Sequence, residues 1–311
     1  MKAACHRLVV LGLCLIFGHA RAEDPAKVHA TIERSLQFLA KAGDAWMAEQ
    51  NCVSCHHMGV LIRSQAEALR KGFKVDQTKL DAWTDWTLLL LDGKSKPGVE
   101  ALAELALALP AAAPQLQSRL LKEQQPDGTW KPGGQFATMQ QRTTSEAQEA
   151  TTRLSLLALL AVNGNTATSE KALAKLGPAT EADSTETLVW RALLTKGQKS
   201  NPALAEIIRR QNADGGWAWR TGEWVSDALA TGEVLAALKD FPGTKAAADH
   251  ARGWLVSHQN ADGSWPIDAS LISKLSRKDF TRVNGIYTFW GTAWATIGLL
   301  QDSPEPGVAS R

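Results

Sequence analysis

The sequence predicts an all-α fold made of six helical hairpins. Apolar residues recur at the spacing of amphipathic helices along most of the chain, which is rich in Ala and Leu, and no segment shows the alternation of a strand. A second observation is a loop pattern of Gln, Asp-Gly and Trp that returns at a regular interval. Together these features indicate one repeated helical unit.

The loop pattern occurs three times, as QQPDGTW at 124–130, QNADGGW at 211–217 and QNADGSW at 259–265. Trp130 and Trp217 are 87 residues apart, which is twice a unit of about 43, and Trp265 follows 48 residues later. In each copy we expect the helix to end at the Gln, the Gly to adopt positive φ and the Trp to fold back onto the preceding helix. The loop is therefore interpreted as a structural staple.

Helical spacing between these loops defines the elements in order. Capping boxes support the helix starts at Ser145 with Gln148 and at Asp183 with Glu186. The predicted hairpins are 28–42 with 58–71, 77–91 with 98–109, 112–124 with 146–162, 168–176 with 183–195, 202–211 with 226–239, and 245–258 with 288–301.

Residues 252–255 (RGWL), followed by Gln259, Gly263 and Trp265, resemble the QW repeat of squalene-hopene cyclases and their prenyltransferase relatives. The resemblance covers about 275 residues and implies an (α/α)6 toroid, with inner and outer helices alternating around a central cavity. The acidic DxDD string of the cyclases does not occur, and the zinc ligands of the prenyltransferases are not found. Asp183 and Asp227 lie at predicted helix starts, where a capping role is expected.

The amino terminus is typical of a secretory signal peptide. Lys2 and Arg7 precede an apolar run at 8–17, and Ala20-Arg21-Ala22 follows as a cleavage site. We expect residues 1–22 to be removed on export to the periplasm, residues 23–302 to form the toroid, and residues 303–311 to form a tail. No later segment is apolar enough to span a membrane. The mature chain has a net charge of about −1, without the basic patch that nucleic acid requires.

The first hairpin carries C-x-x-C-H, formed by Cys52, Cys55 and His56, at the position where three of the other hairpins carry a Gln-Asp-Gly-Trp turn. This motif predicts covalent haem c, with two thioether bonds from the cysteines and His56 as an axial iron ligand. The longer string CVSCHH is also similar to exported bacterial proteins that combine a cytochrome c motif with a toroid.

Two other uses of the motif stay open. A zinc site would draw on the cysteines, His56 and His57, although adjacent histidines do not easily face one tetrahedral ion. A disulfide, structural or redox-active, is the other alternative. For haem, Met139 is the first candidate for the sixth ligand and His258 is the alternative, whereas His57 cannot easily reach the opposite face of the iron.

Three functions follow from these observations. The leading hypothesis is an exported c-type haem protein that transfers electrons to a redox partner protein. The alternative is a non-haem toroid that binds or transforms an isoprenoid or other apolar small molecule, in an aromatic-lined cavity with a convergent acid. The third is a scaffold without cofactor or pocket. Several aromatic residues in or near the rim loops are candidates to line a haem or ligand pocket: Phe136, Trp219, Trp224, Tyr287, Phe289 and Trp290.

Overall fold

The computed structural model describes residues 23–50, 57–92, 97–133, 136–137, 140–163, 167–177, 184–220, 222–272 and 280–303. The predicted signal peptide, most of the tail, and Cys52, Cys55, His56 and Met139 lie outside these residues. Within them the regular structure is helical, and the strand-like pairing is one isolated bridge between Gln124 and Trp130. None of the described helices is long and apolar enough to cross a membrane.

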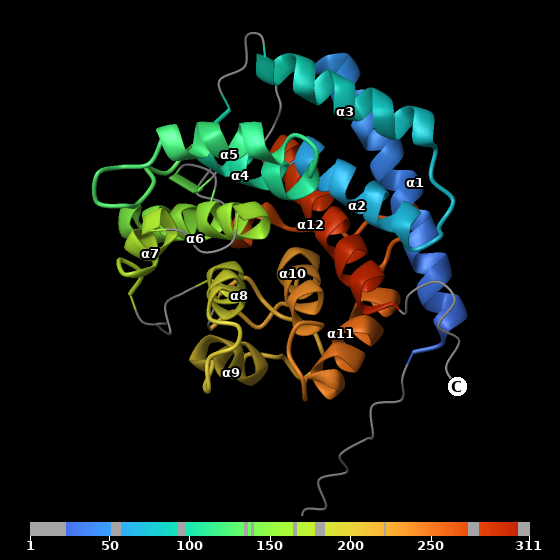
Figure 1. Ribbon diagram of the computed structural model, residues 1–311. Helices are drawn as coiled ribbons and strands as arrows, with labels where there is room; N and C mark the ends of the chain where they lie inside the picture. The colour runs from blue at the N-terminus through green and yellow to red at the C-terminus, as the bar shows by residue number, and fades with distance from the viewer. Residues whose placement is uncertain are drawn as a thin grey trace, which may run out of the picture.

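The helices alternate between an outer and an inner ring, as Figure 1 shows. The outer helices are α1 (Pro25–Glu49), α3 (Gln77–Asp92), α5 (Ala113–Lys122), α7 (Ala167–Leu173), α9 (Pro202–Arg209) and α11 (Lys245–His258). The inner helices are α2 (Met58–Arg70), α4 (Val99–Ala108), α6 (Thr144–Asn163), α8 (Thr185–Leu194), α10 (Ala228–Leu238) and α12 (Phe280–Asp302). A short 3-10 helix, η2 (Ala269–Leu271), precedes α12.

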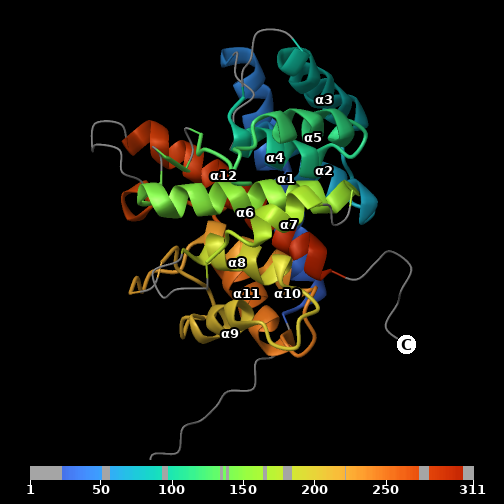
Figure 2. The same ribbon diagram turned by 60° about the vertical axis from the view of Figure 1, so that its left-hand side comes forward.

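Each inner helix packs against the next, and α12 returns to α2, so the ring is closed. Figure 2 shows α6 across the front, with α4 and α5 on one side and α8 and α9 on the other. The closest pair is α10 with α12, where Gly232 faces Gly298. A Cβ at Gly232 would lie 2.4 Å from the backbone of Trp294, so glycine permits this approach. The predicted toroid is confirmed.

The three Gln-Asp-Gly-Trp loops share one geometry, as the staple interpretation requires. Each Trp Nε1 donates to the carbonyl ten residues earlier, on Leu120, Ile207 and Leu255, at 2.7, 2.7 and 2.8 Å. The backbone N–H of the same Trp donates to a threonine of the following inner helix: Thr152, Thr231 or Thr292. Each loop therefore ties an outer helix to the inner helix of its own hairpin.

The glycine of each loop fastens the hairpin to its neighbour. Gly128, Gly215 and Gly263 have φ between 90° and 96°. A Cβ at these positions would meet the backbone of Ala172, His250 and Arg34, on the next outer helix in each case. For Gly263 this helix is α1, so the last loop closes the ring onto the first hairpin.

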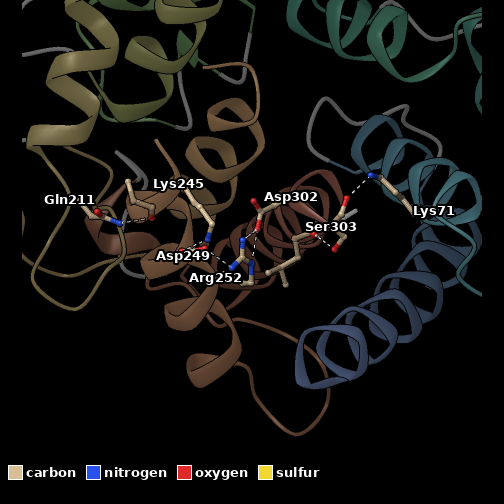
Figure 3. A network of polar contacts seen from close by, with 9 residues as sticks. Lys71, Gln211, Lys245, Asp249, Arg252, Asp302 and Ser303 are labelled. Atoms are coloured by element: carbon tan, nitrogen blue, oxygen red, sulfur yellow. Dashed lines mark hydrogen bonds and ion pairs between the residues drawn. The ribbon is translucent and has the colours of Figure 1, made fainter. Parts of the chain in front are cut away.

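Polar contacts at the carboxyl end of α12 complete the closure, as Figure 3 shows. Arg252 of α11 forms ion pairs with Asp302 and with Asp249. Lys71, which follows α2, donates to the backbone carbonyl of Ser303 at 2.7 Å. The carboxyl end of α12 is thereby held between the last outer helix and the first inner one.

Some predicted boundaries were wrong. Helix α1 continues to Glu49 rather than ending at 42, and α12 begins at Phe280 rather than 288. The capping box of α6 lies at Thr143 and Glu146, whose side chains exchange hydrogen bonds with each other's backbone N–H. For α8 the N-cap is Ser184, which accepts from the Thr187 N–H.

Candidate functional site

A cavity of about 520 Å³ lies at the centre of the ring, and all six inner helices contribute to its wall. Its mouth includes Lys196, Lys239 and Gln301, which lie at or just beyond the carboxyl ends of α8, α10 and α12. The wall is mostly apolar, through leucines of α4, α6 and α8 together with Trp190 and Trp294. We call this space the central cavity.

Two buried carboxyl groups line the central cavity: Glu104 from α4 and Glu233 from α10. They are 3% and 1% exposed. Burial raises the pKa of Glu104 to about 7. Burial, together with the adjacent carboxyl of Glu186, raises the pKa of Glu233 well above its usual range. Two carboxyl groups that lie this close together in a buried site disfavour each other's ionisation.

Glu186 lies next to Glu233, on the side of the inner-helix N-termini. Its Oε2 accepts from Arg142 Nη2 at 2.5 Å, and both side chains are 1% exposed. The Arg142 guanidinium also lies over the rings of Phe136 and Trp219, with centroid distances of 4.6 and 4.9 Å. The Arg142–Glu186 ion pair, packed against Phe136 and Trp219, therefore lies between the cavity acids and the side of the ring where the inner helices begin.

A cation also lines the cavity. The guanidinium of Arg63, on α2, lies over the Trp294 ring at 4.9 Å from its centroid. Burial lowers the pKa of Arg63, while Glu104, Glu67 and Glu233 oppose that shift. The central cavity therefore combines apolar walls with two acids and one guanidinium.

The sequence patterns did not single out Glu104 or Glu233, and they predicted Glu186 as the partner of Asp183 in a capping box. That assignment was wrong, because Ser184 caps the helix and Glu186 points inward to Arg142. A signal was present: Glu104 stands in VEALAELALA and Glu233 in ALATGEVLAAL, where nearly every neighbour is apolar. An acid surrounded by apolar residues on an inner helix is expected to be buried, and a buried acid requires a partner or a function. Asp227, in contrast, is the cap that was expected, and it accepts from Ala230 N–H.

The residue that follows the predicted haem motif lies on the side of the ring opposite the mouth of the central cavity. His57, the residue after the motif, is the N-cap of α2. Its buried imidazole stacks between Trp46 of α1 and Phe289 of α12, at centroid distances of 3.8 and 4.3 Å. These interactions orient the histidine toward the aromatic rings. Because Cys52, Cys55 and His56 lie outside the described residues, haem attachment stays a prediction.

Of the two candidates for a sixth iron ligand, Met139 also lies outside the described residues. His258 ends α11, where its neighbour Gln259 donates to the Thr31 carbonyl and accepts from Arg34. Arg34 precedes Trp46 by 12 residues on α1, or about 18 Å along the helix axis. The structure does not bring His258 to the residue that follows the motif.

The predicted rim aromatics take different places. Phe136, Trp219, Tyr287, Phe289 and Trp290 are buried, whereas Trp224 is 85% exposed. Phe289 stacks on His57, and the rings of Phe136 and Trp219 lie against the Arg142 guanidinium. Tyr287 lies within α12 rather than in a loop.

Comparison with known proteins shows the fold. Type II terpene cyclase MstE from Scytonema is 15% identical, over 89% of this chain and 98% of that chain, with a TM-score of 0.59. A substituted form of that cyclase, in complex with its substrate geranylgeranyl dihydroxybenzoate, has a TM-score of 0.57 at 14% identity, over 89% and 97%. A possible GH105 family member from Klebsiella pneumoniae has a TM-score of 0.54 at 14% identity, over 96% and 98%. The sequence matches no protein-family model and no curated protein.

Proposed function

We propose that this chain binds an apolar small molecule in its central cavity. The observation that carries the proposal is a cavity of about 520 Å³ walled by all six inner helices, apolar along its sides and with Glu104 and Glu233 in its wall. Ligand pockets of this kind are apolar, with a few polar groups that orient the ligand. The likeness to a terpene cyclase solved with a geranylgeranyl compound supports an isoprenoid as the first class to test.

The test uses farnesol and the hydrocarbon farnesene, followed through the fluorescence of Trp190 and Trp294, which line the cavity. Leu157→Trp fills the cavity and is expected to weaken binding at least tenfold. The control is Leu121→Trp on outer helix α5, where the side chain is 42% exposed, and it is expected to leave binding unchanged. Failure of both compounds to bind, or equal binding by both variants, contradicts the proposal.

We propose as a second function that haem c is attached through Cys52 and Cys55, with His56 as an axial iron ligand. The C-x-x-C-H spacing carries this proposal. The stacking of His57 between Trp46 and Phe289 supports His56, rather than His57, as the proposed iron ligand. The donor set, two thiols and one imidazole, fits the group.

Bound haem would supply one-electron redox chemistry, with a redox partner protein as the other participant. In this chain the two thiols would each add across a porphyrin vinyl group, and His56 would hold the iron. Trp46 and Phe289 would fix the start of α2, and so the position of the residue preceding His57.

Expression with the cytochrome c maturation machinery tests this second function. A denaturing gel stained for haem peroxidase activity is expected to show covalent haem in the wild-type chain and none in Cys52→Ser/Cys55→Ser. His57→Gln keeps the motif intact and is expected to retain the stain. An unstained wild-type chain that binds zinc or forms the 52–55 disulfide contradicts haem attachment.

A further inference from the structure

Several polar groups of the central cavity have no hydrogen-bond partner within the described part of the chain. Two of them are Glu104 Oε2 and Trp294 Nε1. Both oxygens of Glu233 likewise accept from no described donor group, and their close polar neighbour is the carboxyl of Glu186. The Arg63 guanidinium contacts the Trp294 face but forms no hydrogen bond or ion pair with a described residue. Acceptors and donors therefore face the same space.

Such groups are seldom left unsatisfied, because each buried donor or acceptor without a partner costs about 1–3 kcal/mol. Glu104, Glu233 and Trp294 are each at least nine-tenths buried. They converge from α4, α10 and α12 on one cavity whose remaining wall is apolar. The arrangement is that of a polar head-group site at the end of an apolar pocket.

We propose that the molecule in the central cavity carries a neutral hydroxyl head group, which donates to Glu104 or Glu233 and accepts from Arg63 or Trp294. This inference rests on the proposed ligand-binding function and names its ligand class: an apolar alcohol or diol. A hydroxyl group both donates and accepts, so it matches a site that offers both kinds of partner.

Charged head groups match the site less well. An ammonium group only donates, so it would leave Trp294 without an acceptor and would lie near the charge of Arg63. A carboxylate only accepts, and it would face Glu104 and Glu233. Either ion would also add a net charge to a buried site in which Arg63 and Glu104 oppose each other, at a high desolvation cost. A neutral head group leaves this balance intact.

The test compares four ligands that share an isoprenoid tail and differ in their terminal group: farnesol, farnesene, farnesylamine and farnesoic acid. Each is titrated at pH 7. Farnesol is expected to bind about tenfold more tightly than farnesene, which corresponds to one or two net hydrogen bonds. Farnesylamine and farnesoic acid are expected to bind more weakly than farnesol.

Glu104→Leu is expected to remove most of the advantage of farnesol while leaving farnesene binding unchanged, which also shows that the variant is folded. Glu104→Gln, whose amide both donates and accepts, is expected to keep part of that advantage. Glu206→Gln is the matched control and is expected to leave both affinities unchanged, because Glu206 lies on outer helix α9, outside the central cavity, and is paired with Arg209 at 2.6 Å.

The other outcomes overturn the inference in different ways. Equal binding of farnesol and farnesene means that water satisfies these groups. Tightest binding of farnesylamine identifies a cation site, and tightest binding of farnesoic acid identifies an anion site governed by Arg63. If none of the four compounds binds, the proposed ligand-binding function itself fails, and with it this inference.

Discussion

Arg142 and Glu186 form an ion pair that is almost completely excluded from solvent. Ser184 Oγ accepts a second hydrogen bond from Arg142 Nη2 at 2.9 Å, so the guanidinium connects the start of α8 to the loop before α6. Removing one partner of such a pair leaves a buried charge without compensation, which typically costs 3–5 kcal/mol. The pair thus holds one end of the ring closed.

We therefore expect Arg142→Met to lower the free energy of unfolding in urea by about 3–5 kcal/mol. The matched control is Lys196→Met, which breaks the half-exposed pair with Asp240 and is expected to cost at most about 1 kcal/mol. Adding Glu186→Gln to Arg142→Met is expected to recover part of the loss. Equal costs for the two single variants would show that the buried pair is not structurally important.

Glu104 also predicts how stability depends on pH. Its pKa is about 7 in the folded chain and near 4.5 in the unfolded chain, and Asp227 is likewise raised to about 7 by burial. At a pH between the unfolded-state and folded-state pKa values of these two carboxyl groups, the folded chain binds more protons than the unfolded chain. The free energy of unfolding therefore falls as pH rises through this range. Over the full range between the unfolded and folded pKa values, Glu104 contributes about 3 kcal/mol and Asp227 about 4 kcal/mol to that fall.

The wild-type chain is accordingly expected to be less stable in urea at pH 8 than at pH 5. Glu104→Gln is expected to reduce this loss of unfolding free energy between pH 5 and pH 8, because only the contribution of Asp227 would remain of the two. Glu206, whose pKa is lowered to about 2, acts below this window and serves as the control through Glu206→Gln. A stability that stays level or increases from pH 5 to pH 8 would rule out the raised pKa values.

At the scale of elements, the glycine of the last Gln-Asp-Gly-Trp loop predicts a large effect from one methyl group. Gly263 has a φ of +90°, and a Cβ there would lie 2.2 Å from the Arg34 carbonyl oxygen of α1. Gly243 has a φ of +82° with open space around it. An alanine at either site would have the cost of a left-handed backbone conformation. Only at Gly263 would its Cβ also collide with the backbone of α1.

Gly243→Ala is expected to destabilise the chain by about 1–2 kcal/mol, the cost of a left-handed alanine. Gly263→Ala is expected to cost a further 1–3 kcal/mol or so, because the loop must move away from α1. Thermal or urea unfolding of the two variants measures this difference. Equal losses would mean that the loop does not need close contact with the first hairpin.

The elements were predicted from sequence more completely than their ends. The repeat and the helical spacing predicted all six hairpins, because a staple that recurs at a fixed interval reports the unit directly. The start of α12 was placed too late, since Asn284 and Gly285 are poor helix formers and read as loop. Val283 and Tyr287 are buried there, so packing overrides the local preference.

The sequence predicted the kind of site but not the residues that form it. The sequence suggested a cavity with aromatic walls and a convergent acid, but Glu104, Glu186 and Glu233 are 47 to 129 residues apart in the chain. Which acids meet depends on the rotation of α4, α8 and α10 about their axes, and only the packed ring fixes that rotation. Conversely, Cys52, Cys55 and His56 are a local motif, and the fold adds only the placement of their neighbour His57.

At the scale of the whole molecule, the ring has two different faces. The long loops between outer and inner helices lie at the inner-helix N-termini, where Arg142 closes the centre and His57 stacks on Phe289. The central cavity opens at the carboxyl ends, near Lys239 and Gln301. His57, the residue after the predicted haem motif, thus lies on the side of the ring opposite the mouth of the central cavity, and it does not line that cavity.

We therefore expect the two proposed functions to be separable. Cys52→Ser/Cys55→Ser is expected to abolish covalent haem, judged by haem staining, and to change farnesol affinity by less than about twofold. Leu157→Trp is expected to do the reverse, weakening farnesol binding at least tenfold with the stain unchanged. Both experiments use the full chain, and urea unfolding confirms that each variant keeps its fold. Loss of farnesol binding in the cysteine variant would show instead that the haem end and the cavity form a single site.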